Sequence, residues 1–165
     1  VSGPCELPTP LHVDVVPVES AADMFEAVKT RAKEQDVIIK AAAVADYTPV
    51  TVNTEKTKKK EGEASIALKR TTDILSWLGE HKEKGQFLCG FSMETENMLE
   101  NSKKKLEKKH ADMIVANNLK VAGAGFGTDT NVVTLITKEG AKELPIQTKD
   151  VVSYEILNEI MNKMA

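Results

Sequence analysis

One run of small residues ends in a carboxylate and could form a ligand-contacting strand end. Residues 40–46 read KAAAVAD and follow the apolar residues of a candidate strand. Without large side chains, the backbone N–H and C=O groups could approach a ligand closely and hydrogen-bond to a base edge. Asp46 would add an acceptor for ribose hydroxyls or for a base amino group. The alternative, which composition alone favours, is that the alanines pack against a helix and Asp46 caps a turn.

A lysine-rich segment follows about ten residues later. Residues 55–60 read EKTKKK, which places four lysines within five residues. These like charges repel one another unless they are solvated or neutralised by an anion. A mobile lysine loop can close over phosphates and stabilise the charge of a transferring phosphoryl group. An ordinary solvated surface segment is the alternative.

A second lysine cluster lies in residues 103–109. On a helix Lys105 and Lys109 share a face, as do Lys104 and Lys108, and like charges at this spacing slightly destabilise the helix. A bound anion would relieve the repulsion, and a solvated helix face is the alternative. An RNA-binding surface is a further alternative, although no aromatic residues are interleaved with these lysines.

Other patterns carry little chemistry. The glycines of residues 123–127 do not have the G-x-G-x-x-G spacing of a dinucleotide-binding loop. His12, His81 and His110 are far apart in the sequence and form no metal motif. Cys89 lies in an apolar run, which indicates a buried and unreactive thiol.

The composition excludes several classes of protein. The chain has 165 residues, enough for one domain, and its net charge of −3 argues against a general nucleic-acid binder. No apolar run reaches the roughly 18–20 residues that span a bilayer, and neither a signal peptide nor a membrane partner is expected. With two cysteines, a disulfide framework is not expected, and we predict a reduced, cytoplasmic protein.

The elements that would position these residues alternate along the chain. Helices are expected from Ser20 to about residue 35, after Thr71 or Thr72, over residues 97–110, and from about Asp150 onward. Strands are expected over residues 12–18, 36–45, 65–69, 86–91, 111–116, 131–138 and 142–145. Residues 47–63 and 117–130 read as loops.

This alternation predicts an α/β fold, with a mostly parallel sheet flanked by helices and an antiparallel hairpin near the C-terminus. In open sheets of this kind, ligands bind beyond the carboxyl ends of the strands. We expect residues 41–46, 91–94 and 116–118 to lie at those ends.

Five segments, taken in order and with their spacing, resemble phosphopantothenoylcysteine synthetases, the phosphopantothenate–cysteine ligases of coenzyme A biosynthesis. They are residues 42–47 (AAVADY), 55–59 (EKTKK), 72–75 (TDIL), 90–95 (GFSMET) and 116–118 (ANN). The AAVAD and K-x-K-K elements are the most specific, and the resemblance covers essentially the whole chain. In many bacteria this enzyme is the C-terminal half of a fusion with a flavin-dependent decarboxylase, which would bind FMN.

The resemblance implies a Rossmann-like fold, a homodimer and a reaction in two steps. Bacterial members use CTP with Mg²⁺. The carboxylate of 4'-phosphopantothenate attacks the α-phosphate, and pyrophosphate leaves behind an acyl-cytidylate. The amine of L-cysteine then attacks the acyl group, and CMP is released.

The resemblance also implies roles for individual residues. Lys56 would be the catalytic lysine that stabilises the charge developing as the acyl-cytidylate forms. The remaining implied contacts are with CTP: Lys40, Ala41 and Ala42 through their backbone, Asp46 through its carboxylate, Thr72, Asp73, Ile74, Leu75 and Phe91 around the base and ribose, and Lys105 and Lys109 at the phosphates. The metal ligands and the cysteine-binding residues are not implied.

The chain departs from the family pattern in three places. The family more often has Pro at the position of Thr72 and an Asn-Asp pair where this chain has Asn117 and Asn118. The family also opens with a strand and a Gly- and Ser-rich loop, whose Asn serves the attack by cysteine, before the V-S-G-P segment that begins here. We therefore expect residues 1–165 to form a single ligase domain without its N-terminal strand–loop–helix segment, which is about 30–50 residues.

Such a fragment is expected to have weakened or absent ligase turnover and to retain part of the CTP site. A non-catalytic nucleotide-binding module or an RNA-interacting module is the alternative function.

Overall fold

A computed structural model describes residues 1–56, 58, 62, 64–94, 98–118, 121, 125 and 127–165. The chain divides into two compact units, each built from two separate stretches of sequence. We call Lys29–Ala41 with Ile74–Ala165 the sheet unit, and Val1–Val28 with Ala42–Asp73 the ribbon unit.

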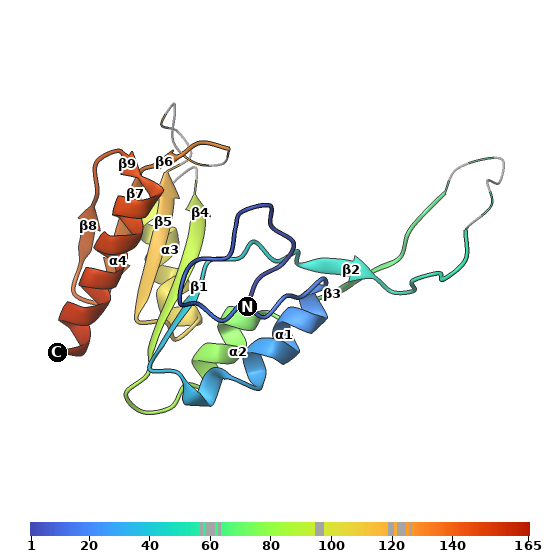
Figure 1. Cartoon of the computed structure of the whole chain (residues 1–165), viewed down its shortest axis with the longest axis horizontal. Helices are drawn as coiled ribbons and strands as arrows, with labels where there is room; N and C mark the ends of the chain where they lie inside the picture. The colour runs from blue at the N-terminus through green and yellow to red at the C-terminus, as the bar shows by residue number, and fades with distance from the viewer. Residues whose placement is uncertain are drawn as a thin grey trace. The chain divides into compact units, whose positions relative to one another are not determined.

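The sheet unit is built on a five-stranded mixed sheet (Figure 1). Its order is β1 (Val37–Lys40), β4 (Phe87–Glu94), β5 (Met113–Asn118), β7 (Val133–Thr137) and β8 (Ala141–Glu143). The first three strands are parallel, and the β5–β7 and β7–β8 pairs are antiparallel. The α/β fold and the C-terminal hairpin expected from the sequence are therefore confirmed.

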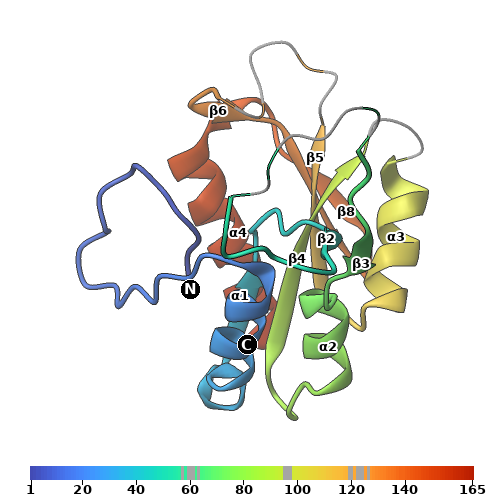
Figure 2. The same cartoon turned by 90° about the vertical axis from the view of Figure 1, so that its right-hand side faces the viewer.

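The two faces of this sheet are covered by different helices (Figure 2). Because side chains alternate along a strand, Phe87 and Cys89 face one side and Leu88 faces the other. Helix α4 (Lys149–Met164) packs Val152, Ile156 and Ile160 against the Phe87 side, and the three side chains join the buried core cluster there.

The opposite face of the sheet is covered by α2 (Ile74–Glu80) and α3 (Met98–Lys108). The side-chain oxygens of Ser92 and Ser102 lie 3.1 Å apart and join β4 to α3. At Gly90 of β4, an added Cβ would lie 2.5 Å from Leu75 of α2. A glycine there lets α2 pack closely on the strand.

A short antiparallel pair, β6 (Thr130–Asn131) with β9 (Gln147–Thr148), precedes α4. The Thr148 hydroxyl accepts a hydrogen bond from the Val151 N–H and caps the helix. The expected start of this helix near Asp150 is confirmed within one residue.

The ribbon unit contains α1 (Ala21–Lys29), apart from its last residue, and a two-stranded antiparallel ribbon of β2 (Tyr47–Pro49) and β3 (Leu68–Arg70). The predicted cap of α1 is confirmed, because the Ser20 hydroxyl accepts from the Asp23 N–H at 3.1 Å. The Asp23 carboxylate in turn accepts from the Ser20 N–H at 2.9 Å, which completes a reciprocal cap.

The strand predicted over residues 12–18 is wrong, since only a single bridge from Ser2 to Pro17 forms. Ser2 donates to the Val16 carbonyl at 3.0 Å and accepts from the Val18 N–H at 2.9 Å. Gly3 and Pro4 then follow Ser2, and a proline has no N–H with which to extend the ladder.

Other boundaries differ from the prediction because local turns end the elements early. Helix α1 ends at Lys29 and a 3₁₀ turn follows at Ala32–Glu34, so the helix expected to reach about residue 35 is shorter. Strand β1 ends at Lys40, so the small residues from Ala41 onward leave the sheet. The segment 47–63, expected to be loop, begins with β2.

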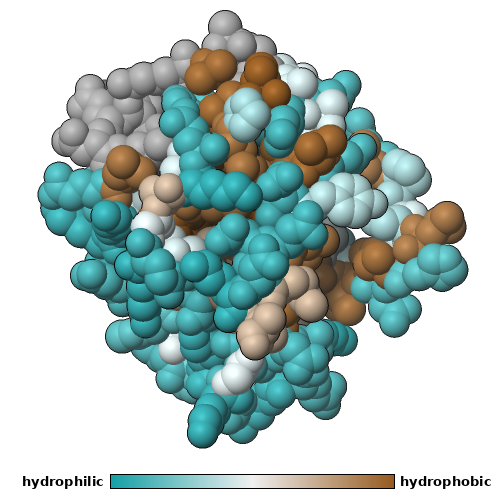
Figure 3. All heavy atoms as spheres, turned by 90° about the vertical axis from the view of Figure 1, so that its left-hand side faces the viewer, coloured by the Kyte–Doolittle hydropathy of each residue, from teal (hydrophilic) through white to brown (hydrophobic). Residues whose placement is uncertain are grey.

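No helix among the described residues is both long enough and apolar enough to cross a membrane. Figure 3 views the molecule from the side of α4 and β8, where hydrophilic residues dominate and hydrophobic ones lie in patches among them. The exposed apolar side chains of α4 are Val151, Tyr154, Leu157, Met161 and Met164.

Candidate functional site

A cavity of about 280 Å³ opens in the sheet unit at the carboxyl ends of the parallel strands. Ala41 directly follows β1, Phe91 belongs to β4, and Asn117 lies near the end of β5. The rest of the lining is Gly125, Asn131, Lys149, Val152, Ser153 and Ile156. The cavity therefore lies at the end of the sheet where ligands of open α/β sheets bind.

The floor of this cavity is apolar and belongs to the core. Phe91 is half-buried and packs against the core cluster that includes Val152 and Ile156 of α4. Pockets for drug-sized ligands measure roughly 300–1000 Å³. The volume here suits one part of a nucleotide, such as its base or its ribose, better than a whole triphosphate.

The rim of the cavity is polar. The amide nitrogen Nδ2 of Asn131 donates to Oδ1 of Asn117 at 2.7 Å. Lys149, the first residue of α4, is exposed, and its backbone N–H donates to the Asp129 carbonyl at 2.8 Å. The cavity thus combines an aromatic floor with amide groups and one cation.

Of the residues expected to bind the nucleotide, Ala41 and Phe91 are brought together in this cavity. Lys40, the last residue of β1, is half-buried and precedes Ala41 directly. Ile74 and Leu75 are 2% and 6% exposed beneath β4, so their side chains serve the core. Contacts from these two residues to a ligand would have to come from the backbone.

Lys105 and Lys109 lie one turn apart, as expected, and the Lys109 N–H donates to the Lys105 carbonyl at 2.9 Å. Both side chains are half-buried. The Lys109 ammonium donates to the Ser76 hydroxyl at 2.8 Å and so links the end of α3 to α2.

In the ribbon unit, Thr71 joins the two ends of the ribbon. Its N–H donates to the Asp46 carbonyl at 3.0 Å, and its hydroxyl donates to the Ala45 carbonyl at 2.6 Å. Asp46 is therefore held beside Thr71, and Thr72 and Asp73 follow directly. The side chains of Thr72 and Asp73 are exposed, as are those of Ala42 and Asp46.

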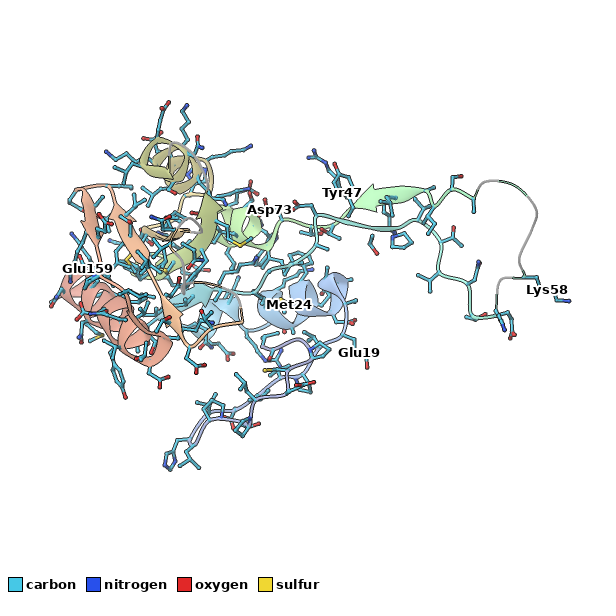
Figure 4. All side chains as sticks on the ribbon, turned by 90° about the horizontal axis from the view of Figure 1, so that it is seen from above. Glu19, Met24, Tyr47, Lys58, Asp73 and Glu159 are labelled. Carbon is cyan, nitrogen blue, oxygen red and sulfur yellow. The ribbon has the colours of Figure 1, made fainter. Side chains whose placement is uncertain are left out.

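Lys56 lies on the segment that connects β2 to β3 and is exposed. Figure 4 shows Tyr47 in the ribbon and Lys58, two residues beyond Lys56, far from Tyr47 at the outer end of the segment. Lys59 and Lys60, the other lysines of the motif, lie outside the described residues.

Cys89 is fully buried, and burial, reinforced by the charge of Asp112, raises the pKa of its thiol to about 12. Such a thiol carries almost no thiolate at neutral pH, which supports the prediction that it is unreactive. Within the described part of the chain, no three His, Cys, Asp or Glu side chains are grouped to hold a metal ion.

Three residues that line the cavity were not among the site residues predicted from the sequence: Asn131, Lys149 and Ser153. They are brought to the strand ends by the β6–β9 pair and by the start of α4. Two-residue strands leave almost no periodic signal in a sequence, although the predicted helix start near Asp150 pointed to this region.

Proteins similar to this chain occur among those of coenzyme A biosynthesis. The family model of the DNA/pantothenate metabolism flavoprotein C-terminal domain matches residues 1–164. The coenzyme A biosynthesis bifunctional protein CoaBC of Bacillus subtilis (strain 168) is 52% identical over 162 residues, which are 97% of this chain and 40% of that protein. CoaBC of Vibrio vulnificus (strain CMCP6) is 40% identical over 166 residues, 99% of this chain and 41% of that protein.

The chain thus spans about two fifths of the curated relatives it matches. A crystal structure of the C-terminal domain of CoaBC is 49% identical, with a TM-score of 0.80, and the match covers 98% of this chain and 73% of that one. A Cab2 mutant in complex with phosphopantothenate-cysteine, at 17% identity and a TM-score of 0.71, covers 90% of this chain and 52% of that one and shows the same fold.

The match over residues 1–164 confirms the resemblance drawn from the five sequence segments. The chain belongs to the family of the DNA/pantothenate metabolism flavoprotein C-terminal domain, as the phosphopantothenoylcysteine synthetase domain found at the C-terminal end of CoaBC.

Proposed function

We propose that the protein containing this chain is a CTP-dependent phosphopantothenate–cysteine ligase. The observation that carries the proposal is the cavity at the carboxyl ends of the parallel strands, where Ala41 and Phe91 meet. The resemblance drawn from the sequence implies that both residues contact the nucleotide. The family membership supplies the reaction class.

A carboxylate is a poor acyl donor, and joining it to CMP creates a good leaving group. The chemistry required of the protein is therefore positioning of the two reactants and neutralisation of the phosphate charge. The backbone of Lys40, Ala41 and Ala42 and the ring of Phe91 would hold the nucleoside, and Asp46 would accept hydrogen bonds from it. Residues 72–75 would complete the contacts with the nucleoside.

Lysines would supply the positive charge. Lys105 and Lys109 would bind the phosphates, and their spacing of one turn supports this. Lys56 would stabilise the charge that develops as the acyl-cytidylate forms. Its exposure on a connecting segment is compatible with a residue that closes over bound substrate.

Mg²⁺ in this proposal accompanies the triphosphate, since Mg²⁺ is commonly held by substrate phosphates with few protein ligands. The described residues do not form a carboxylate cage for it, so no step is assigned to the ion. FMN would belong to a fused decarboxylase and has no role in the residues described. A reduced, cytoplasmic setting belongs to the same proposal.

The substrates 4'-phosphopantothenate and L-cysteine are supported by the Cab2 complex, whose fold this chain shares. A homodimer is supported by the exposed apolar side chains of the ribbon unit, which include Val50, Val52, Ile66 and Leu68. Isolated two-stranded ribbons are marginally stable in water, and a second copy would cover these side chains.

The test is a titration of the chain with CTP plus Mg²⁺, beside ATP, NAD and a short RNA, followed by a ligase assay. We expect a clear preference for CTP. We also expect turnover to be stronger in a protein extended through the upstream Gly- and Ser-rich loop than in this chain. Equal turnover by the two would refute the role given to that loop, and preferred binding of RNA would refute the ligase.

A further inference from the structure

Two asparagine side chains at the rim of the cavity form a fixed pair. Asn117 lies near the end of β5, and Asn131 is the last residue of β6. Nδ2 of Asn131 donates to Oδ1 of Asn117 at 2.7 Å, and both residues line the cavity. Neither side chain has a role implied by the sequence pattern or by the family resemblance.

A backbone group decides which way this pair points. The Val132 N–H donates to Oδ1 of Asn131 at 2.9 Å, so the oxygen of that amide is occupied by the main chain. The nitrogen of Asn131 must then face Asn117, and Asn117 can meet it only with its oxygen. The amide nitrogen Nδ2 of Asn117 is consequently turned away from Asn131, and no partner for it occurs among the described residues.

The segment that carries Asn131 is itself held on two sides. Asn131 pairs with Gln147 in the β6–β9 ladder. The carbonyl of Val132 accepts from the Asn118 N–H at 3.0 Å, which ties the segment to the end of β5. Both asparagines are half-buried, so reorientation of either amide would have to break these contacts.

We propose that Asn131 is a positioning residue of the nucleotide site, which holds Asn117 so that it offers an amide N–H₂ donor, not an oxygen, to the cavity. The matching ligand group is a hydrogen-bond acceptor of the nucleoside, either a carbonyl oxygen of the base or a ribose oxygen. This inference rests on the proposed function, because it takes the cavity as part of the CTP site.

Two substitutions separate a positioning role for Asn131 from a purely structural one. A purely structural role predicts the larger loss of nucleoside affinity for Asn131→Ala, which removes more atoms than Asn131→Asp. Asn131→Asp keeps the acceptor for the Val132 N–H but loses the donor to Asn117, so the Asn117 amide should turn over and present its oxygen to the cavity. Asn131→Ala removes both contacts and leaves Asn117 free to choose its orientation. If Asn131 positions Asn117, the Asp variant binds nucleoside more weakly than the Ala variant, although it removes fewer atoms.

The experiment measures the affinity for CTP with Mg²⁺ and for cytidine by calorimetry, together with the melting temperature, on the intact protein. For Asn131→Asp we expect about a tenfold to hundredfold weaker affinity and little change in melting temperature. For Asn131→Ala we expect no more than about a fivefold loss. Cytidine carries no charge, so a loss seen with it as well cannot arise from repulsion between the new carboxylate and the phosphates.

Asn118→Asp is the matched control. It makes the same change one residue along β5, on the opposite face of the strand, and gives the Asn-Asp pair that the family more often has. We expect its affinity for CTP to match that of the unaltered protein. In an Asn117→Ala background, Asn131→Asp should have no further effect on affinity, because the amide that it reorients is gone.

Equal or reversed affinities of the Asp and Ala variants, or a loss that persists in the Asn117→Ala background, would overturn the positioning role while leaving the ligase proposal intact. An unaltered protein that binds neither CTP nor cytidine would overturn both.

Discussion

The two units of the molecule differ in how much of their structure is buried. In the sheet unit, β7 is buried along its whole length and Met113 to Ala116 of β5 are shielded from solvent. In the ribbon unit, every residue of β3 is exposed and β2 is half-buried only at Thr48. Stability is therefore concentrated in the sheet unit, where most of the apolar burial occurs.

The candidate functional residues, unlike the buried core, are shared between the two units. Lys56 and Asp46 lie in the ribbon unit, which contributes little to the core, whereas Ala41 and Phe91 lie in the sheet unit. Catalytic groups on exposed segments can move onto a substrate without breaking a core. The contrast implies that the lysine step and the nucleoside pocket can be altered independently.

The largest expected difference is in thiol reactivity. Cys5 of the ribbon unit is exposed, and Cys89 of the sheet unit is buried with its pKa raised to about 12. We expect Cys5 to be alkylated by iodoacetamide at least about a thousandfold faster than Cys89, measured by mass spectrometry at about pH 8. Comparable rates would show that β4 opens readily and would remove the contrast between the units.

Lys56→Ala should lower acyl-cytidylate formation by about a hundredfold to a thousandfold, the usual loss when one charge-stabilising group is removed. The melting temperature should not change, because the side chain is exposed. Pyrophosphate release in a single turnover of the complete ligase measures the step. Lys58→Ala, an equally exposed lysine two residues on, is the control and should stay within a few-fold of the unaltered protein. Normal acyl-cytidylate formation by Lys56→Ala would remove its catalytic role.

Gly79→Ala, in contrast to Lys56→Ala, should lower the stability of the fold, because the substitution affects packing and not a residue assigned to the chemistry. A Cβ at this position of α2 would lie 1.9 Å from the backbone carbonyl oxygen of Lys109, so α2 and the end of α3 must separate. Alanine is favoured over glycine in a helix by about 1 kcal/mol, but a clash with backbone outweighs that gain. We expect the free energy of unfolding in urea to fall by about 2 kcal/mol.

Gly140→Ala controls for the loss of a glycine, since nothing lies within 4 Å of its added Cβ. Its unfolding free energy should change by no more than about 0.5 kcal/mol. If Gly79→Ala were as neutral as this control, the close packing of α2 on α3 would be contradicted.

The smallest expected effect concerns pH. A hydrogen bond from Thr137, its own backbone N–H and the ammonium of Lys163 lower the pKa of Glu139 to about 2. A carboxylate with a lowered folded-state pKa stabilises the fold above its unfolded pKa of about 4.5, and this is lost as the pH falls toward 2.

Glu139→Gln should therefore be slightly less stable than the unaltered protein at about pH 6. This gap, the difference between their free energies of unfolding, should narrow by about pH 3. Urea unfolding at the two pH values measures it. Because Glu139 is exposed, high salt should shrink the gap as well. A gap that widens on acidification would contradict the sign.

The sequence predicted the sheet unit well where apolar runs and caps coincide. The runs around Phe87 and Met113 became β4 and β5, and Thr148 capped α4 within one residue of the predicted start. It failed at residues 12–18, because a valine-rich run shows the propensity for a strand but not whether a partner continues alongside. Pro4 ended that partner after one bridge.

Part of the site was equally accessible to sequence reasoning. Strand ends with small residues predicted the position of Ala41, and the resemblance supplied Phe91, which lines the same cavity. The Asn117–Asn131 pair could not be predicted from the sequence, because the contact that orients it, from the Val132 N–H, depends on a tertiary arrangement. The position of Lys56 relative to the cavity stays a prediction.

The connectivity of the sheet has a consequence for how the protein is made. β1 is synthesised before β4, its neighbour in the sheet, and β4 follows only after the ribbon and α2 have emerged from the ribosome. During that interval the apolar residues Val37, Ile38 and Ile39 lack the hydrogen-bonding partner that β4 later supplies. Nascent chains stalled between α2 and β4 should therefore be the most dependent on chaperones, and slowing translation over that stretch should raise aggregation.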